Sequence, residues 1–285
     1  MATPGVFFKS ITELNRMLVN REVSSRELTE AYLARMEALG PKYNALAALT
    51  RKSALDRAKA VDDDLKRKRY RGPLQGIPFG AKDLLAYPGY PTTWGAKPFA
   101  GQTFDTKAAA MENLEGKGAV LVAKLAMVEL AGAGGYEYAA ASLTGPGRNP
   151  WNTEHWSGGS SSGSGSAVAA GLVPYALGSE TWGSILTPSA FCGVTGLRPT
   201  YGYVSRYGAM PLSWTMDKIG PICRSAEDCG LVLQALAGGD SRDRGSADKS
   251  FYYGPQYVGA LSRLTVGYNP VDFEQWAEPS TRPAF

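Results

Sequence analysis

The sequence predicts an α/β layered fold with a largely parallel or mixed sheet, because short apolar segments alternate along it with segments of helical periodicity. Its 285 residues suffice for one large α/β domain or two small ones, and no repeat of fixed period divides them. Hydrophobic residues make up 44% and charged residues 20%, which is typical of a folded globular protein and excludes a disordered or fibrous one.

Three helices are predicted within the first 70 residues. The first two are each introduced by a serine with glutamate three residues later, the spacing of a capping box: Ser10 with Glu13 and Ser24 with Glu27. Gly40-Pro41 ends the second helix. The third spans residues 53–69, and its runs of aspartate and lysine are typical of a solvated face rather than of a binding surface.

Strands and helices alternate in the remainder of the chain. Apolar runs predict strands over residues 77–81, 119–123, 173–177 and 264–267. Helices are predicted over residues 106–115, 125–130, 167–170 and 225–237. No helix follows the last predicted strand to cover a sheet edge, so we expect the C-terminal part of the fold to be missing.

Composition excludes several classes of function. Thirty basic residues against 26 acidic ones leave a net charge of +4, which is too small to indicate a nucleic acid or an anionic membrane as partner. The most apolar window, residues 119–133, is interrupted by Lys124 and Glu129, so no membrane span is expected. No secretory signal opens the sequence, and its three cysteines lack paired spacing, which together favour a cytoplasmic protein.

The chain contains a single histidine, His155. Sites that need two histidines, including most histidine-rich metal hydrolase centres, are therefore excluded, and we expect neither metal nor organic cofactor. A Ser-His-Asp triad would have to use this residue, which is more typical of a polar loop position than of a ligand.

Residues 157–166 consist only of serine and glycine. Such a run is often a flexible linker, but Trp151 and Trp156 before it and the apolar segment after it indicate buried flanks. A phosphate-binding loop is disfavoured because no Gly-Lys-Ser/Thr ends the run. The remaining interpretation is a backbone held beside a chemical site, with a hydroxyl able to carry a proton.

A second cluster and a lysine complete the candidate site. Ser184 lies on a turn after a predicted strand, where successive backbone amides can converge on a developing oxyanion. A nucleophilic serine needs a base, and a buried lysine can serve because desolvation lowers its pKa. Lys82 ends the apolar run 76–81, although a lysine after a strand is more commonly a solvated charge.

The ordered motifs resemble those of the amidase signature family. They are Gly76-Ile-Pro-Phe-Gly-Ala-Lys82-Asp, Asn149-Pro-Trp, Gly158-Gly-Ser-Ser, Gly178-Ser-Glu-Thr-Trp-Gly-Ser184-Ile and Gly193-Val-Thr-Gly-Leu-Arg-Pro-Thr-Tyr-Gly. The resemblance extends from about residue 10 to about residue 240. It implies a mixed sheet sandwiched between helices, formed by a single amidase domain over residues 1–285 that is incomplete, with residues 1–70 as a helical segment packing on it.

The resemblance also implies the roles of individual residues. Ser184 would be the nucleophile, Ser160 the middle serine on a cis Gly159-Ser160 peptide, and Lys82 the base. Backbone N–H groups of Thr181, Trp182 and Gly183 would form the oxyanion hole. The expected reaction is hydrolysis of the C–N bond of a small carboxylic amide through an acyl-enzyme ester.

Two departures from the family pattern concern the substrate. Trp182 stands where the family commonly has glycine, and Leu186 stands where it commonly has arginine. Tryptophan inside the oxyanion turn would be strained unless its backbone angles are ordinary. Loss of the cation favours apolar or neutral amides over anionic ones.

Three functions remain open at this point. The first is a free-standing amidase acting on a small-molecule amide, with a homodimer left open and no nucleic-acid contact by this chain alone. The second is the glutamine-hydrolysing amidase component of a tRNA-dependent amidotransferase, against which Leu186 argues. The third is a non-catalytic fragment or pseudoenzyme.

Overall fold

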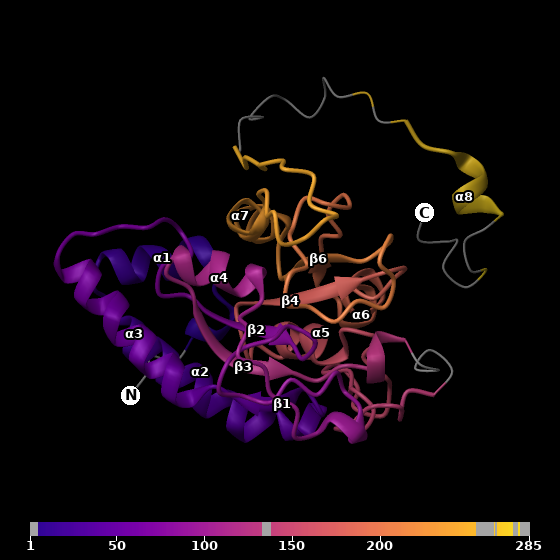
Figure 1. The fold of residues 1–285 in the computed structure, drawn as a ribbon, viewed down its shortest axis with the longest axis horizontal. Helices are drawn as coiled ribbons and strands as arrows, with labels where there is room; N and C mark the ends of the chain where they lie inside the picture. The colour runs from indigo at the N-terminus through magenta and orange to yellow at the C-terminus, as the bar shows by residue number, and fades with distance from the viewer. Residues whose placement is uncertain (1–4, 133–137, 255–264, 266, 276–278, 280–285) are drawn as a thin grey trace. The chain divides into compact units, whose positions relative to one another are not determined.

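The computed structural model describes residues 5–132, 138–254, 265, 267–275 and 279. The chain divides into two units, residues 1–252 and residues 253–285. In the first unit a six-stranded sheet with the order β1-β3-β2-β4-β6-β5 lies between helices (Figure 1). In the second, the short helix α8 (Pro270–Glu274) is capped by the side chain of Asn269.

The sheet is mixed, as predicted. Its central strands β3 (Val120–Leu125), β2 (Pro78–Lys82) and β4 (Tyr175–Glu180) run parallel to one another. The outer strands β1 (Leu46–Leu49), β6 (Lys218–Cys223) and β5 (Thr195–Gly196) are each antiparallel to a neighbour. Parallel pairing places the carboxyl ends of β2 and β4 at one edge of the sheet, the usual position of a site in such folds.

Helices cover both faces of this sheet. They are α1 (Ile11–Val19), α2 (Ser25–Leu39), α3 (Arg51–Lys66), α4 (Ala109–Gly116), α5 (Ser162–Ala169), α6 (Leu186–Cys192) and α7 (Ala226–Leu236). Both predicted capping boxes are present, since each serine side chain accepts from the backbone of the glutamate three residues later and that glutamate binds back. Single 3₁₀ turns occur at Val6–Phe8, Pro41–Tyr43, Lys97–Phe99 and Glu129–Ala131.

Two hydrophobic clusters fill the space between sheet and helices. Along β3, Val120 and Val122 belong to one cluster while Leu121 belongs to the other. Along β4, Tyr175 and Ala176 divide in the same way. This alternation follows from the two-residue period of a strand, and it explains why these strands are apolar on both faces.

Several predicted elements differ from those observed. The helix predicted over residues 125–130 is wrong, because β3 continues through Leu125 and only a 3₁₀ turn follows it. The helix predicted at 167–170 begins earlier, at Ser162, inside the serine and glycine run. Strands β1, β5 and β6 and helix α6 were not predicted, and the strand predicted over 264–267 falls mostly outside the described residues.

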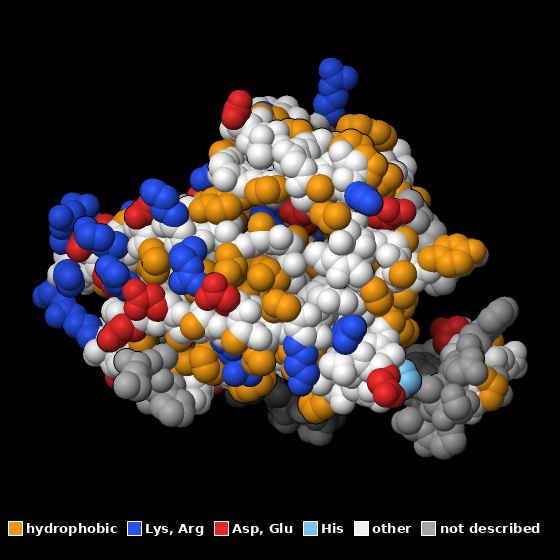
Figure 2. All heavy atoms as spheres, turned by 90° about the horizontal axis from the view of Figure 1, so that it is seen from below, with side chains coloured by type: hydrophobic (Ala, Val, Ile, Leu, Met, Phe, Trp, Pro, Cys, Tyr) orange, Lys and Arg blue, Asp and Glu red, His pale blue; other side chains and the backbone are white. Residues whose placement is uncertain are grey.

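Charged side chains of both signs gather at one end of the first unit, around α3 (left in Figure 2). Lys59 pairs with Asp63 at 3.3 Å, and Arg71 pairs with Asp64 at 2.6 Å. Such mutual pairing agrees with a solvated face rather than a binding surface. Within the described residues, no helix has the length and apolarity that crossing a membrane requires.

Candidate active site

Lys82 is the last residue of β2, and its side chain is fully buried. Its Nζ lies 2.7 Å from Ser160 Oγ, 3.0 Å from Ser179 Oγ and 3.4 Å from the Ser179 carbonyl oxygen. A neutral amine has two N–H donors and one lone pair. These three partners therefore suit a neutral Nζ that donates twice to Ser179 and accepts from the Ser160 hydroxyl.

The surroundings of Lys82 favour that neutral form. Burial lowers the pKa of Lys82 to about 7, and the carboxylates of Asp217 and Glu180 act in the opposite direction. The desolvation effect wins because no carboxylate forms an ion pair with Nζ among the described residues. The amine can thus exchange a proton near neutral pH.

Ser160 follows a cis peptide bond from Gly159 and is fully buried. Every residue of the run 157–166 is buried, and helix α5 begins within it, so the structure excludes a flexible linker. One prediction about its flanks is wrong. Trp151 is 77% exposed, although its indole Nε1 donates to the Cys192 carbonyl oxygen at 2.8 Å.

Glycine in this run is required by close packing. A Cβ on Gly163 would lie 2.6 Å from the backbone nitrogen of Ala126 and from the carbonyl oxygen of Ala45. These neighbours are backbone atoms of the chain beside β1 and β3, so they cannot rotate away. Helix α5 can approach the sheet this closely only because its first turn carries no side chain there.

Ser184 lies on the turn between β4 and α6 and is buried. The backbone N–H of Ser161, the residue after Ser160, donates to the Ser184 carbonyl oxygen at 3.2 Å. That bond joins the two serine-bearing segments side by side. The structure therefore gathers Lys82, Ser160 and Ser184 from three distant parts of the sequence around the carboxyl ends of β2 and β4.

The turn also contains the three residues predicted to form an oxyanion hole. Gly183 has a φ of 97°, which favours glycine, whereas Trp182 has a negative φ and its backbone is unstrained. The Trp182 side chain is 84% exposed. In the described part of the chain, the backbone N–H groups of Trp182 and Gly183 donate to no acceptor, which leaves them open to a ligand oxygen.

Thr181 is held from two sides. Its hydroxyl donates to the Asp217 carboxylate, and its carbonyl oxygen accepts from Lys218 Nζ at 3.0 Å. The second carboxylate oxygen of Asp217 accepts from the backbone of Leu212 at 2.6 Å and of Ser213 at 3.1 Å. Asp217 thus ties the turn to the loop of residues 211–217.

Glu180 fixes the other end of the same turn. Its buried carboxylate accepts from the backbone N–H of Ile185 at 2.7 Å and of Leu186 at 2.9 Å, at the start of α6. Its other oxygen lies 3.4 Å from the Arg198 guanidinium. A carboxylate at a helix start satisfies N–H groups that the helix itself leaves open.

A buried ion pair stands beside Lys82. Lys124 Nζ donates to Asp83 Oδ1 at 2.7 Å and to Thr92 Oγ1 at 2.9 Å. The backbone N–H of Thr93 donates to the other oxygen of Asp83 at 2.9 Å. Asp83 is thereby engaged with Lys124, which leaves Lys82 without this neighbour as a counter-ion.

Sequence reasoning assigned no role to Glu180, Asp217 or Lys124. Each lies in or beside a quoted motif or an apolar strand, so position alone marked them weakly. The stronger signal was the charge itself inside apolar sequence, as at Lys124 in the run 119–126.

The remaining singled-out residues have structural positions. His155 is exposed on the loop before the serine and glycine run. Cys192, Cys223 and Cys229 are buried and free. Across the residues that the structure describes, no three His, Cys, Asp or Glu side chains are grouped so as to hold a metal ion.

Comparison with known proteins agrees with this geometry. A model of the Amidase family matches residues 27–285. The chain is 42% identical over 276 residues to one component of the glutamyl-tRNA(Gln) amidotransferase of Methylococcus capsulatus, a match that covers 95% of this chain and 56% of that protein. The component of the same name from Chloroflexus aggregans is 39% identical, covering 97% and 56%.

Solved structures give the same result. The native peptide amidase from Stenotrophomonas maltophilia matches with a TM-score of 0.79 and 37% identity over 86% of this chain and 51% of that one. A bacterial aryl acylamidase of the amidase signature enzymes matches with a TM-score of 0.77 and 27% identity, over 86% and 50%.

The chain spans about half the length of the relatives that it matches. Its sheet order, its motifs and the family match agree over nearly all the residues compared. This chain therefore belongs to the amidase signature family.

Proposed function

We propose that this chain carries the catalytic serines and lysine of an amidase that hydrolyses the C–N bond of a small carboxylic amide. Ser184 is the nucleophile, Ser160 the proton carrier and Lys82 the base. The observation that carries the proposal is the buried Lys82 Nζ, 2.7 Å from Ser160 Oγ and with a pKa lowered to about 7.

Acylation needs one proton relay. Neutral Lys82 accepts the Ser160 proton, Ser160 accepts the Ser184 proton, and Ser184 Oγ attacks the amide carbonyl carbon. Ser160 then gives a proton to the leaving nitrogen and regains one from Lys82, so the C–N bond breaks and an amine or ammonia departs. An ester on Ser184 remains.

Deacylation repeats the relay with water. Water gives a proton through Ser160 to Lys82 while its oxygen attacks the ester, and the acid leaves as Ser184 is reprotonated. In both steps the backbone N–H groups of Trp182 and Gly183 hold the oxyanion, each contributing about 3 kcal/mol by analogy with other hydrolases. Apart from substrate and water, each group on this path is a residue of the chain.

A second candidate is glutamine hydrolysis as the amidase component of a tRNA-dependent amidotransferase. It is favoured by 42% identity to a component of an enzyme of that kind. Against it stands Leu186, a half-exposed apolar side chain at the start of α6 where the family commonly has a cation. Release of ammonia from glutamine only with copurified partner proteins would favour this candidate.

The assay that tests the proposal is a panel of simple amides and glutamine, run with the purified chain and with two variants, Ser184→Ala and Lys82→Ala. We expect turnover of neutral amides by the chain and a loss of at least about 10³-fold in each variant. Variants that turn over amides as fast as the parent would refute the assigned roles.

A fluorophosphonate distinguishes an enzyme from a non-catalytic binding module. Covalent labelling of Ser184, located by peptide mass, is expected for an activated nucleophile. Ser213→Ala is the matched control, since it removes a hydroxyl from the loop after residue 210 and should leave labelling unchanged. A chain that folds but is never labelled would be a pseudoenzyme.

We further propose that residues 1–285 contribute to a single amidase domain, with residues 1–70 packing on it. Leu33 and Met36 of α2 share a hydrophobic cluster with β3, which supports this arrangement. Three free buried cysteines fit a reducing compartment such as the cytoplasm. A homodimer, and the absence of nucleic-acid contact by this chain alone, are part of the same proposal.

A further inference from the structure

A cavity of about 630 Å³ lies close to the candidate active site and has no part in the chemistry proposed above. The segment that follows Lys82 forms its base. Leu85 pairs with Ala209 in an isolated bridge, and the Ala86 N–H donates to the Gly208 carbonyl oxygen at 2.9 Å. Because Gly208 and Ala209 line the cavity, it lies next to the end of β2.

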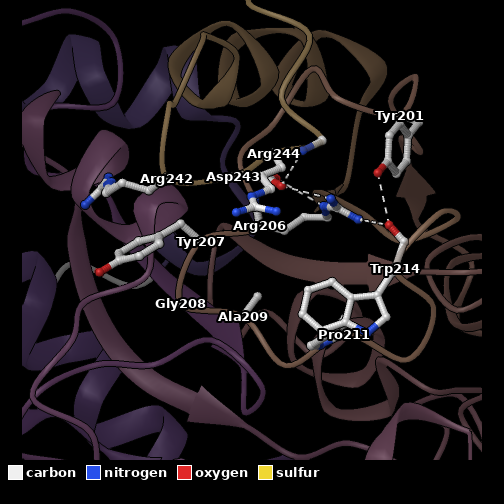
Figure 3. Close-up of a pocket in the computed structure, with 11 residues that line it drawn as sticks. Tyr201, Arg206, Tyr207, Gly208, Ala209, Pro211, Trp214, Arg242, Asp243 and Arg244 are labelled. Carbon is white, nitrogen blue, oxygen red and sulfur yellow. Dashed lines mark hydrogen bonds and ion pairs between the residues drawn. The ribbon is translucent and has the colours of Figure 1, made fainter.

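The wall of the cavity is rich in positive charge. Three guanidinium groups, those of Arg206, Arg242 and Arg244, line it together with one carboxylate, that of Asp243 (Figure 3). Arg206 pairs with Asp243 at 2.9 Å, and Arg242 is held by two carboxylates that do not line the cavity. Arg244 has no ion pair with any residue that the structure describes.

The rest of the wall is flat and apolar. Two tyrosines, Pro211 and the 75% exposed ring of Trp214 contribute to it. In Figure 3, Tyr201 and Trp214 lie on one side of the arginines, and Tyr207 lies on the other. The Arg206 guanidinium stands 4.7 Å from the ring centre of Tyr201, so the cationic and aromatic surfaces are continuous.

We infer that this cavity binds a small-molecule carboxylate carried on a planar apolar body. The carboxylate would lie at Arg244, whose planar guanidinium can donate two parallel hydrogen bonds, and the body would lie against Trp214 and Tyr201. A volume of about 630 Å³ is in the range of pockets that enclose such molecules. The inference does not rest on hydrolysis by this chain.

The cavity is connected to the oxyanion turn through the loop of residues 211–217. The Trp214 carbonyl oxygen accepts from Arg206 Nη1 at 2.6 Å and from the Tyr201 hydroxyl at 3.0 Å. At the end of the same loop, Asp217 accepts from Thr181. A ligand in the cavity therefore contacts the loop that holds the turn, whether it is the distal end of an amide substrate or a separate molecule.

Binding is tested by calorimetry with 3-phenylpropanoate, and with 3-phenylpropan-1-ol as its neutral counterpart, on the Ser184→Ala chain. We expect the carboxylate to bind at least fivefold more tightly than the alcohol. Adding Arg244→Ala should remove that preference. Adding Arg67→Ala should keep it, because Arg67 is an equally charged, exposed residue beyond the end of α3.

Position is tested in the same chain labelled with 5-fluorotryptophan. The ¹⁹F resonance that Trp214→Phe removes should move on addition of 3-phenylpropanoate. Equal affinities for acid and alcohol, an Arg244→Ala variant that binds the acid as tightly as its parent, or a Trp214 resonance that stays in place at saturation would each overturn the inference. Circular dichroism confirms that the variants fold.

The two sources of the carboxylate are distinguished by hydrolysis of 4-carbamoylbenzoate and benzamide. If the carboxylate belongs to the substrate, KM is lower for 4-carbamoylbenzoate and Arg244→Ala removes the difference. If it belongs to a separate ligand, the two KM values agree, while 3-phenylpropanoate changes kcat for benzamide through Arg244.

Discussion

Replacing Glu180 tests whether this carboxylate fixes the oxyanion turn. Its oxygen accepts two backbone hydrogen bonds, at 2.7 and 2.9 Å, in a buried position. Hydrogen bonds to a charged group contribute about 1.5–3 kcal/mol each, so Glu180→Ala is expected to lower the free energy of unfolding by about 3–5 kcal/mol. Glu180→Gln keeps an acceptor of the same shape and should cost about 1–2 kcal/mol.

The same substitution has a second effect of predictable sign. The Glu180 carboxylate raises the pKa of Lys82 against the larger lowering by burial. Removing its charge in Glu180→Gln therefore lowers that pKa further. The acid limb of the kcat/KM profile should move to lower pH by about half a unit to one unit, or about 0.7–1.4 kcal/mol.

Urea denaturation monitored by circular dichroism gives the first quantity, and amide hydrolysis from about pH 5 to about pH 9 gives the second. Glu154→Gln, which removes an exposed carboxylate, is the matched control and should change neither. A Glu180→Ala chain within about 0.5 kcal/mol of the parent, or an acid limb in Glu180→Gln that moves to higher pH, would refute this reasoning.

Two further predictions concern packing and charge around the site. Lys124→Met leaves Asp83 buried without its 2.7 Å partner and should cost about 3–5 kcal/mol in urea denaturation, whereas adding Asp83→Asn should recover part of the loss. A double mutant as unstable as the sum of the two single ones would contradict this coupling. Gly163→Ala should destabilise by about 1–3 kcal/mol because its Cβ meets backbone atoms at 2.6 Å, while Gly116→Ala, with open space around it, should be neutral or stabilising. Equal stabilities of these two alanine variants would show that α5 can move away from the sheet.

The sequence predicted those parts of the fold that depend on local pattern. Capping boxes located α1 and α2 because an Ncap serine and a glutamate three residues later satisfy each other's backbone. Strands β2 and β3 were found because strands buried on both faces read as continuous apolar runs. Helix α5 was placed too late, because its first turn is made of serine and glycine, which have low helix propensity.

Elements fixed by tertiary contacts escaped prediction. Strand β6 contains Gly220 and Pro221, and it is identified only by its antiparallel pairing with β4. Helix α6 begins at Leu186 with no Ser, Thr, Asp or Asn at its Ncap, because the carboxylate of Glu180 supplies the cap from another segment.

The candidate site divides in the same way. Lys82 and the two serines were identified from motifs, and the structure brings Lys82 within hydrogen-bond distance of Ser160. The buried pair of Lys124 and Asp83 could not be deduced, since its residues are 41 positions apart and meet only through the parallel pairing of β2 and β3.

The most direct test of the account is the pH dependence of Ser184 labelling by a fluorophosphonate. Because the pKa of Lys82 is lowered to about 7, the amine is protonated below that pH and free to accept a proton above it. The rate constant of labelling should rise about tenfold per unit below about pH 7 and level off above it, and Lys82→Met should be labelled at least about 10³-fold more slowly at every pH. A rate that keeps rising towards about pH 10, or a Lys82→Met chain labelled as fast as the parent, would contradict the claim that a neutral lysine activates the serine.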